Sequence, residues 1–255
     1  MYHREGSSLF ALSLAWMSVA LLVLGVGCAP ADADGSIQIV TNQATVEMCP
    51  PAPTQPGNGV LQNGLGFIDT NANFGYVFTP LVVNQASTQN GQFDSSQRRV
   101  QLAGANVTIE FQDPGAVPGG IVDSLDSSGL LAASRRFTGS IEPDDGVLSV
   151  AFELWSPELH ATMLGQLGNA RVDLLATVQL FGTMAGGDVR SQEFDYPITI
   201  CDGCLVNNLG NCVDLAGMEL GVGGGACQAL QDGGPATCCT TGDGTLVCDG
   251  IAPML

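Results

Sequence analysis

Cysteine is the residue type that could take part in the widest range of chemistry in this sequence, which holds nine cysteines in 255 residues. Cys201 and Cys204 form a Cys-x-x-Cys motif, which is typical of a redox-active pair, half of a zinc site or a structural disulfide. A thioredoxin-like redox pair needs a strand followed by a helix, and no helix start follows Cys201. A zinc site needs further ligands, and neither a second Cys-x-x-Cys motif nor a histidine lies nearby. The motif therefore favours a structural disulfide, with metal binding and redox chemistry as the alternatives.

The number of cysteines indicates how they pair. If Cys28 is set aside, an even set of eight remains, which suits a disulfide framework: Cys49, Cys201, Cys204, Cys212, Cys227, Cys238, Cys239 and Cys248. Seven of them lie from Cys201 onward, so at least one must pair outside that segment, and Cys49 is the only candidate. We predict a bridge from Cys49 to the C-terminal segment, whose long loop stabilises the fold by about 4–5 kcal/mol in the chain-entropy argument. Cys238 and Cys239 are adjacent and are expected to have different partners.

Nucleophilic catalysis finds little support among the other residues. His160 is the only histidine beyond the first few residues, and a Ser-His-Asp triad would have to use it. The Gly-x-Ser-x-Gly motif of many serine hydrolases is absent. We interpret His160 as a partly exposed histidine on a helix.

Acidic loop residues offer two further chemistries. Asp69 begins a D-x-N-x-N pattern like that of a calcium loop, but Phe74 stands where glycine is needed and Pro80 where glutamate is needed. The loop retains oxygens for a weak calcium site. Paired carboxylates also hydrolyse glycosides, although Trp155 is the only tryptophan outside the N-terminal apolar run that could stack on a sugar. Turn formation is the ordinary role of the remaining loop acids, which are Asp123, Asp126, Asp144 and Asp145.

The N-terminal segment has the composition of an export signal. Leu9–Cys28 is apolar and uncharged, and it follows a short polar head that contains Arg4. Leu24–Gly27 resembles the lipobox of bacterial lipoproteins, which implies removal of residues 1–27, lipidation of Cys28 and an acidic tether over residues 28–35. Ala31-Asp32-Ala33 fits ordinary signal peptidase and would release a soluble secreted protein instead. An uncleaved membrane helix is the third interpretation.

Charge narrows the range of partners. The formal net charge is −18, and all seven basic residues are arginines. An acidic surface without a basic stripe repels nucleic-acid phosphates, so nucleic acid is not an expected partner. Attachment to a membrane must come from acyl chains rather than from electrostatic adsorption. Few charged residues and many glycine, threonine, valine and asparagine residues favour a β-rich extracytoplasmic domain over a helical one.

Hydrophobic periodicity places the strands. Apolar residues alternate along Ala105–Phe111 and along Val172–Leu180, as in half-buried strands. Gly186-Gly187 is expected to turn the chain into a return strand, in which Arg190 and every second residue up to Ile200 share a face. The two strands predict a long β-hairpin.

Two other apolar runs, Phe74–Val83 and Val147–Leu154, are each expected to form one strand. Ser156 followed by proline and glutamate predicts the start of a helix that runs to Leu167. Residues 36–200 are therefore predicted to form a β-sandwich, with an immunoglobulin-like topology and one short helix. Residues 201–255 are too poor in apolar side chains for a core of their own and are predicted to form a small disulfide-rich module.

The C-terminal segment carries a recognisable pattern: CDGCLV from Cys201, ACQALQD over Ala226–Asp232, the Cys238-Cys239 pair, and LVC over Leu246–Cys248. This pattern resembles that of a group of bacterial outer-membrane lipoproteins of unknown function. The resemblance implies an outer-membrane location and disulfides, and it brings no catalytic residues or cofactor. We therefore expect a non-enzymatic envelope lipoprotein that binds another envelope protein or a surface polymer. The alternative is a secreted hydrolase that uses loop carboxylates, with or without calcium.

Overall fold

The computed structural model describes residues 35–44, 49–53, 62–70, 75–87, 95–164, 166–167, 170–215, 227, 231, 236–244 and 246–248. These residues belong to one compact unit, Ala33–Leu255. The predicted signal peptide, the lipidation site Cys28 and the tether up to residue 34 lie outside the described residues. Among the described residues, no helix has the length and hydropathy that a membrane crossing requires.

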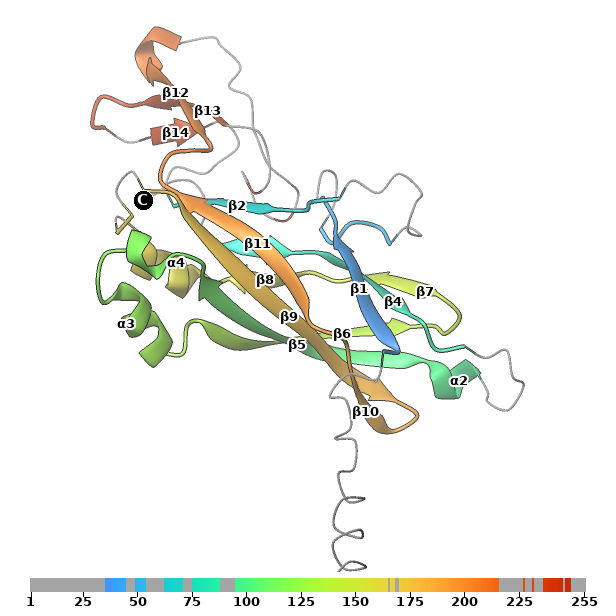
Figure 1. Ribbon diagram of the computed structural model, residues 1–255. Coiled ribbons are helices and arrows are strands. Elements are labelled where there is room, and N and C mark those ends of the chain that lie inside the picture. Colours follow the sequence, from blue (N-terminus) through green and yellow to red (C-terminus); the bar gives the residue numbers. More distant parts are fainter. Residues whose placement is uncertain are drawn as a thin grey trace, which may run out of the picture. The chain divides into compact units, whose positions relative to one another are not determined.

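The described strands form four sheets. The largest has the order β2 (Gly66–Asp69), β11 (Phe194–Cys201), β9 (Val172–Met184), β5 (Val100–Phe111) and β6 (Ala132–Ile141), with β10 (Gly187–Arg190) also paired to β9 (Figure 1). A second sheet has the order β1 (Ile37–Asn42), β4 (Pro80–Asn84) and β7 (Gly146–Ser149). A third pairs β3 (Tyr76–Phe78) with β8 (Phe152–Trp155), and a fourth joins β12 (Val206–Asn211), β13 (Ala236–Thr240) and β14 (Leu246–Cys248). The fold is mainly β, as predicted, but an immunoglobulin-like topology is not confirmed.

Alternation along the long central strands creates the core. In β5, Val107, Ile109 and Phe111 are buried while the residues between them are exposed, as predicted. The buried residues of β9 alternate in the same way from Val172 to Leu180. Aromatic rings from the two-stranded sheet of β3 and β8 pack against this face. The ring centroids of Phe78 in β3 and Tyr196 in β11 lie 5.0 Å apart. One continuous apolar cluster therefore joins the first three sheets, and the sheet of β12, β13 and β14 contributes none of its described residues to it.

Three short α-helices occur in the described residues, where one was predicted: α2 (Ser95–Arg98), α3 (Ile121–Ser127) and α4 (Pro157–Met163). Short 3-10 turns lie at Pro114–Ala116 and Cys212–Leu215. The sequence of α3 looked like a loop because glycines and prolines precede it. Its N-cap is Gly120, which has a positive φ of 89° and no side chain to announce a helix. Leu125 anchors α3 because it is fully buried in the core.

The predicted hairpin is present, with two differences. Its turn consists of Ala185 and Gly186, which both have positive φ, and Gly187 already belongs to β10. The return strand is interrupted between β10 and β11, where the buried Ser191 hydroxyl accepts a hydrogen bond from the N–H of Leu180 at 2.9 Å. This irregularity changes the alternation, so Arg190 is exposed while Val189 is buried. The prediction that Arg190 shares a face with the buried end of β11 was wrong.

The two apolar runs expected to be single strands are each divided. Phe74–Val83 contains β3 and β4, which belong to different sheets, and the break falls at Thr79. The buried Asn42 side chain fills this break, because its Oδ1 accepts from the Thr79 N–H at 2.9 Å and its Nδ2 donates to the Tyr196 hydroxyl at 2.9 Å. Val147–Leu154 is divided in the same manner into β7 and β8. Hydrophobicity marked these runs as buried, but the breaks depend on contacts with distant residues.

Candidate functional site

The Cys-x-x-Cys loop lies where two parallel strands end. β2 and β11 run parallel, and their register places Asp69 beside Cys201 at the last position of both strands. A disulfide joins Cys201 to Cys204. Cys201 is buried and Cys204 is exposed, so the loop leads from the core to the surface. The structure therefore assigns this motif to a local disulfide, with a buried carboxylate from a distant part of the chain next to it.

Asp69 holds this loop in place. Its side chain is fully buried, its Oδ1 accepts from the Gly203 N–H at 2.8 Å, and its Oδ2 accepts from the Leu205 N–H at 2.7 Å. The next residue, Thr70, donates from its backbone N–H to the Cys201 carbonyl at 2.8 Å. A buried carboxylate is tolerated only when such donors replace water, and hydrogen bonds to a charged acceptor are the strong ones. Asp69 thus organises the loop. The sequence alone had suggested this residue only as a calcium ligand.

The same three residues are the described group that could hold a metal ion. Ligand atoms of Asp69, Cys201 and Cys204 lie within 4.8 Å of one another. Two thiolates and a carboxylate suit Zn²⁺, but the cysteines would first have to be reduced, because the thiolate is the ligand form. Both carboxylate oxygens of Asp69 also face amide hydrogens, which repel a cation. The disulfide and the carboxylate bound by amides therefore favour a structural role for this site over metal binding.

His160 lies in α4 and is buried, with 4% of its surface exposed, so the expectation of a partly exposed histidine was wrong. Burial lowers the pKa of His160 below its ordinary value, while a hydrogen bond with the backbone of Thr70 and the negative charge of Asp69 oppose this shift. The imidazole is consequently neutral at pH 7. Its position behind Thr70 supports the strand end that holds the Cys-x-x-Cys loop.

Ser156 begins α4, as predicted, and does not form a catalytic pair. Its hydroxyl accepts a hydrogen bond from the Leu159 N–H at 3.2 Å, which is the contact of a helix N-cap. The helix ends at Met163 rather than at Leu167. The hydroxyl of this serine therefore caps a helix instead of acting with His160.

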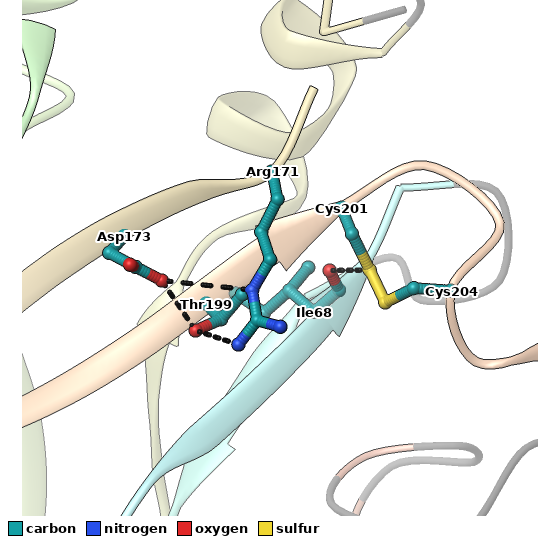
Figure 2. A network of polar contacts seen from close by, with 6 residues as sticks. All are labelled: Ile68, Arg171, Asp173, Thr199, Cys201 and Cys204. Carbon is teal, nitrogen blue, oxygen red and sulfur yellow. Dashed lines mark hydrogen bonds and ion pairs between the residues drawn. A yellow bond between two sulfur atoms is a disulfide. The ribbon is translucent and has the colours of Figure 1, made fainter. Parts of the chain in front are cut away.

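A polar network covers the neighbouring end of the sheet. Figure 2 shows Arg171 reaching over β11, where its Nη2 donates to the Thr199 hydroxyl at 3.3 Å. Thr199 in turn donates to Asp173 Oδ1 at 2.7 Å, and Arg171 Nε lies 4.0 Å from the same oxygen. Cys201 Sγ lies beside this network, 3.5 Å from the Ile68 carbonyl oxygen. Exposed pairs of this kind contribute little stability, so the network orders side chains more than it strengthens the fold.

The remaining disulfides tie the C-terminal segment together and to the rest of the chain. Cys49 is bonded to Cys227, which confirms the bridge predicted from the uneven distribution of cysteines. Cys212 is bonded to Cys239. Cys238 is also in a disulfide, so these adjacent cysteines have different partners, as expected. The backbone of Cys248 lies opposite that of Cys238 in the pairing of β13 with β14.

One further contact joins this segment to the core. The buried Gln231 side chain accepts from the Val77 N–H at 2.8 Å through Oε1 and donates to the Val77 carbonyl at 2.6 Å through Nε2. The amide side chain thereby makes the two hydrogen bonds to β3 that the backbone of a neighbouring strand would make. Neither composition nor spacing distinguishes this glutamine from any other, so the sequence did not predict it.

The loop acids are dispersed. Asp123 and Asp126 belong to α3, so the expectation that they form turns was wrong, whereas Asp144 and Asp145 form the turn after β6 with positive φ. The backbone N–H groups of Asp144 and Asp145 donate to carbonyls of Ala86 and Asn84. Their structural context is that of turn formation, which is the ordinary interpretation of such residues.

Comparison with known proteins adds no relative: no family model, no curated protein and no solved structure matches this chain. The function must therefore be argued from its own residues.

Proposed function

We propose that this chain is an exported lipoprotein of the bacterial outer membrane, lipidated on Cys28, with a structural or binding role in the envelope rather than an enzymatic one. The role is the capture of an envelope protein or a surface polymer by the β-rich domain. The lipid on Cys28 supplies the contact with the membrane.

The disulfides carry this proposal. The structure contains the disulfides Cys49–Cys227, Cys201–Cys204 and Cys212–Cys239. Structural disulfides of this kind are typical of an oxidising compartment and rare in the cytosol. That compartment agrees with the apolar, uncharged segment Leu9–Cys28, which has the composition of an export signal. The location of Asp69 and His160 in structural roles favours a non-catalytic protein.

Intact mass spectrometry of the protein purified from the producing cell tests the proposal. We expect an N-terminus at Cys28 with added acyl mass, and eight cysteines that alkylate only after reduction. Replacement of Cys28 with serine is expected to move the protein out of the membrane fraction. An unmodified N-terminus at Asp34, unaffected by the C28S substitution, would instead identify a soluble secreted protein and end the proposal of a lipid anchor.

A further inference from the structure

Four residues from four strands form one row across the outer face of the largest sheet. Arg190 of β10 is in register with Phe181 of β9, Phe181 with Gly104 of β5, and Gly104 with Arg136 of β6. Residues opposite one another on neighbouring strands present their side chains to the same face. Two arginines separated by a phenylalanine and a glycine therefore line the same patch of surface.

Glycine at position 104 shapes this row. A Cβ atom at Gly104 would lie 2.6 Å from Cζ of Phe181, so the phenylalanine ring occupies the space that a side chain would need. The ring supports Arg136, whose guanidinium carbon lies 5.0 Å from the ring centroid. The pairing of β5 with both neighbours also shifts between Leu102 and Gly104, and such bulges frequently adjoin functional sites. The guanidinium of Arg136 is thus held in a defined orientation.

The row borders a hollow of about 310 Å³. Arg136 and Arg190 line it together with the side chains of Asn106, Ser134 and Asp188. All of these residues are exposed and belong to strands. The hollow therefore combines two cations with an amide, a hydroxyl and a carboxylate.

Some other arginines of the chain are held in ion pairs. Arg99 pairs with Glu142 and Arg171 with Asp173, whereas no ion pair joins Arg136 or Arg190 to any acid among the described residues. Acids outnumber bases 25 to 7 in the chain, so two guanidinium groups in one hollow are not explained by the overall charge. A guanidinium presents a planar fork of donors that matches a carboxylate or a phosphate.

We propose that this hollow binds an acidic saccharide. Arg136 and Arg190 hold the carboxylate or phosphate of the ligand, and Asp188, Asn106 and Ser134 accept from or donate to its hydroxyl groups. Within the proposed binding role, which this inference rests on, the ligand is a surface polymer with acidic sugar units. The lipid anchor is not part of the inference.

Isothermal titration of the purified full-length protein with trigalacturonate and with mannose 6-phosphate tests it. The titrations are done at 0.15 M salt, where the Debye length is about 8 Å, so that remote acidic residues are screened. We expect saturable binding of at least one of the two probes and no binding of neutral maltotriose. Binding of trigalacturonate alone would identify a carboxylate ligand, binding of mannose 6-phosphate alone a phosphate ligand, and either result supports the site.

Variants locate the binding. R136Q and R190Q are each expected to weaken it on the order of tenfold, because each removes charge-assisted hydrogen bonds. R99Q is the matched control, since it removes an exposed, ion-paired arginine elsewhere, and should leave binding unchanged. The proposal is overturned if neither probe binds, or if R99Q weakens binding as much as R136Q does. Mass spectrometry of the N-terminus reports separately on the lipid anchor, so failure of one proposal is distinguishable from failure of the other.

Discussion

The continuous cluster of buried apolar side chains begins at Ile37 and ends at Ile200. Beyond Ile200, the buried side chains in the described part of the chain are three cysteines, Leu205 and Gln231. Burial of apolar surface stabilises the first region in proportion to the area removed from water. The second region has too few apolar side chains for that and depends on covalent bonds and polar clamps. The comparison teaches that the same chain uses two different sources of stability, and that they meet at Asp69, Cys201 and the Cys49–Cys227 bridge.

The largest expected loss of stability comes from removing the disulfide that links the two regions, and it is compared with the loss from removing a disulfide within the C-terminal segment. Replacing both Cys49 and Cys227 with alanine removes a link across 178 residues and should lower the free energy of unfolding by about 4–5 kcal/mol. The matched change at Cys212 and Cys239 removes a link across 27 residues and should cost about 3–4 kcal/mol. Urea denaturation monitored by circular dichroism measures both. Equal losses would contradict the loop-length argument.

A substitution at Asp69 tests the contact between the two regions. Asp69→Asn keeps the shape of the side chain but replaces one acceptor oxygen with an amide that faces a backbone N–H, so we expect a loss of about 2–3 kcal/mol in the free energy of unfolding. The Cys201–Cys204 disulfide should also become more accessible to reductants. Asp195→Asn is the control, because this exposed carboxylate accepts from the Thr177 hydroxyl alone among the described residues, and its change should stay within about 0.5 kcal/mol. Similar losses for the two variants would remove Asp69 from its role as organiser.

His160 gives the smallest effect, which depends on pH. Since its folded-state pKa lies below the ordinary value near 6.5, the unfolded chain binds more protons as the pH falls below that value. Its contribution to stability is therefore complete above about pH 6.5 and is lost as the pH falls toward the folded-state pKa. We expect wild type to lose more stability between pH 7 and pH 5 than His160→Gln does. Parallel curves in thermal unfolding would show that His160 is not the titrating group.

Local patterns predicted the parts of the fold that depend on local physics. The alternation in β5 and β9 and the capped start of α4 at Ser156 were all readable, because side-chain periodicity and capping depend on neighbouring residues. The bridge from Cys49 to the C-terminal segment followed from counting alone. The helix α3 was missed because its signal is the burial of Leu125 rather than a capping residue.

The sequence by itself thus determined a mainly β chain with an acidic, arginine-only charge pattern and a cross-linked C-terminal segment. Only the tertiary structure decided where Phe74–Val83 breaks, that Asp69 holds the Cys201–Cys204 loop, and that His160 is buried behind it. It also decided that Arg136 and Arg190, 54 positions apart in the sequence numbering, share one row of the sheet. The reason is physical: strand register brings together residues that are distant in sequence, and no local pattern of hydrophobicity or charge encodes which strands become neighbours.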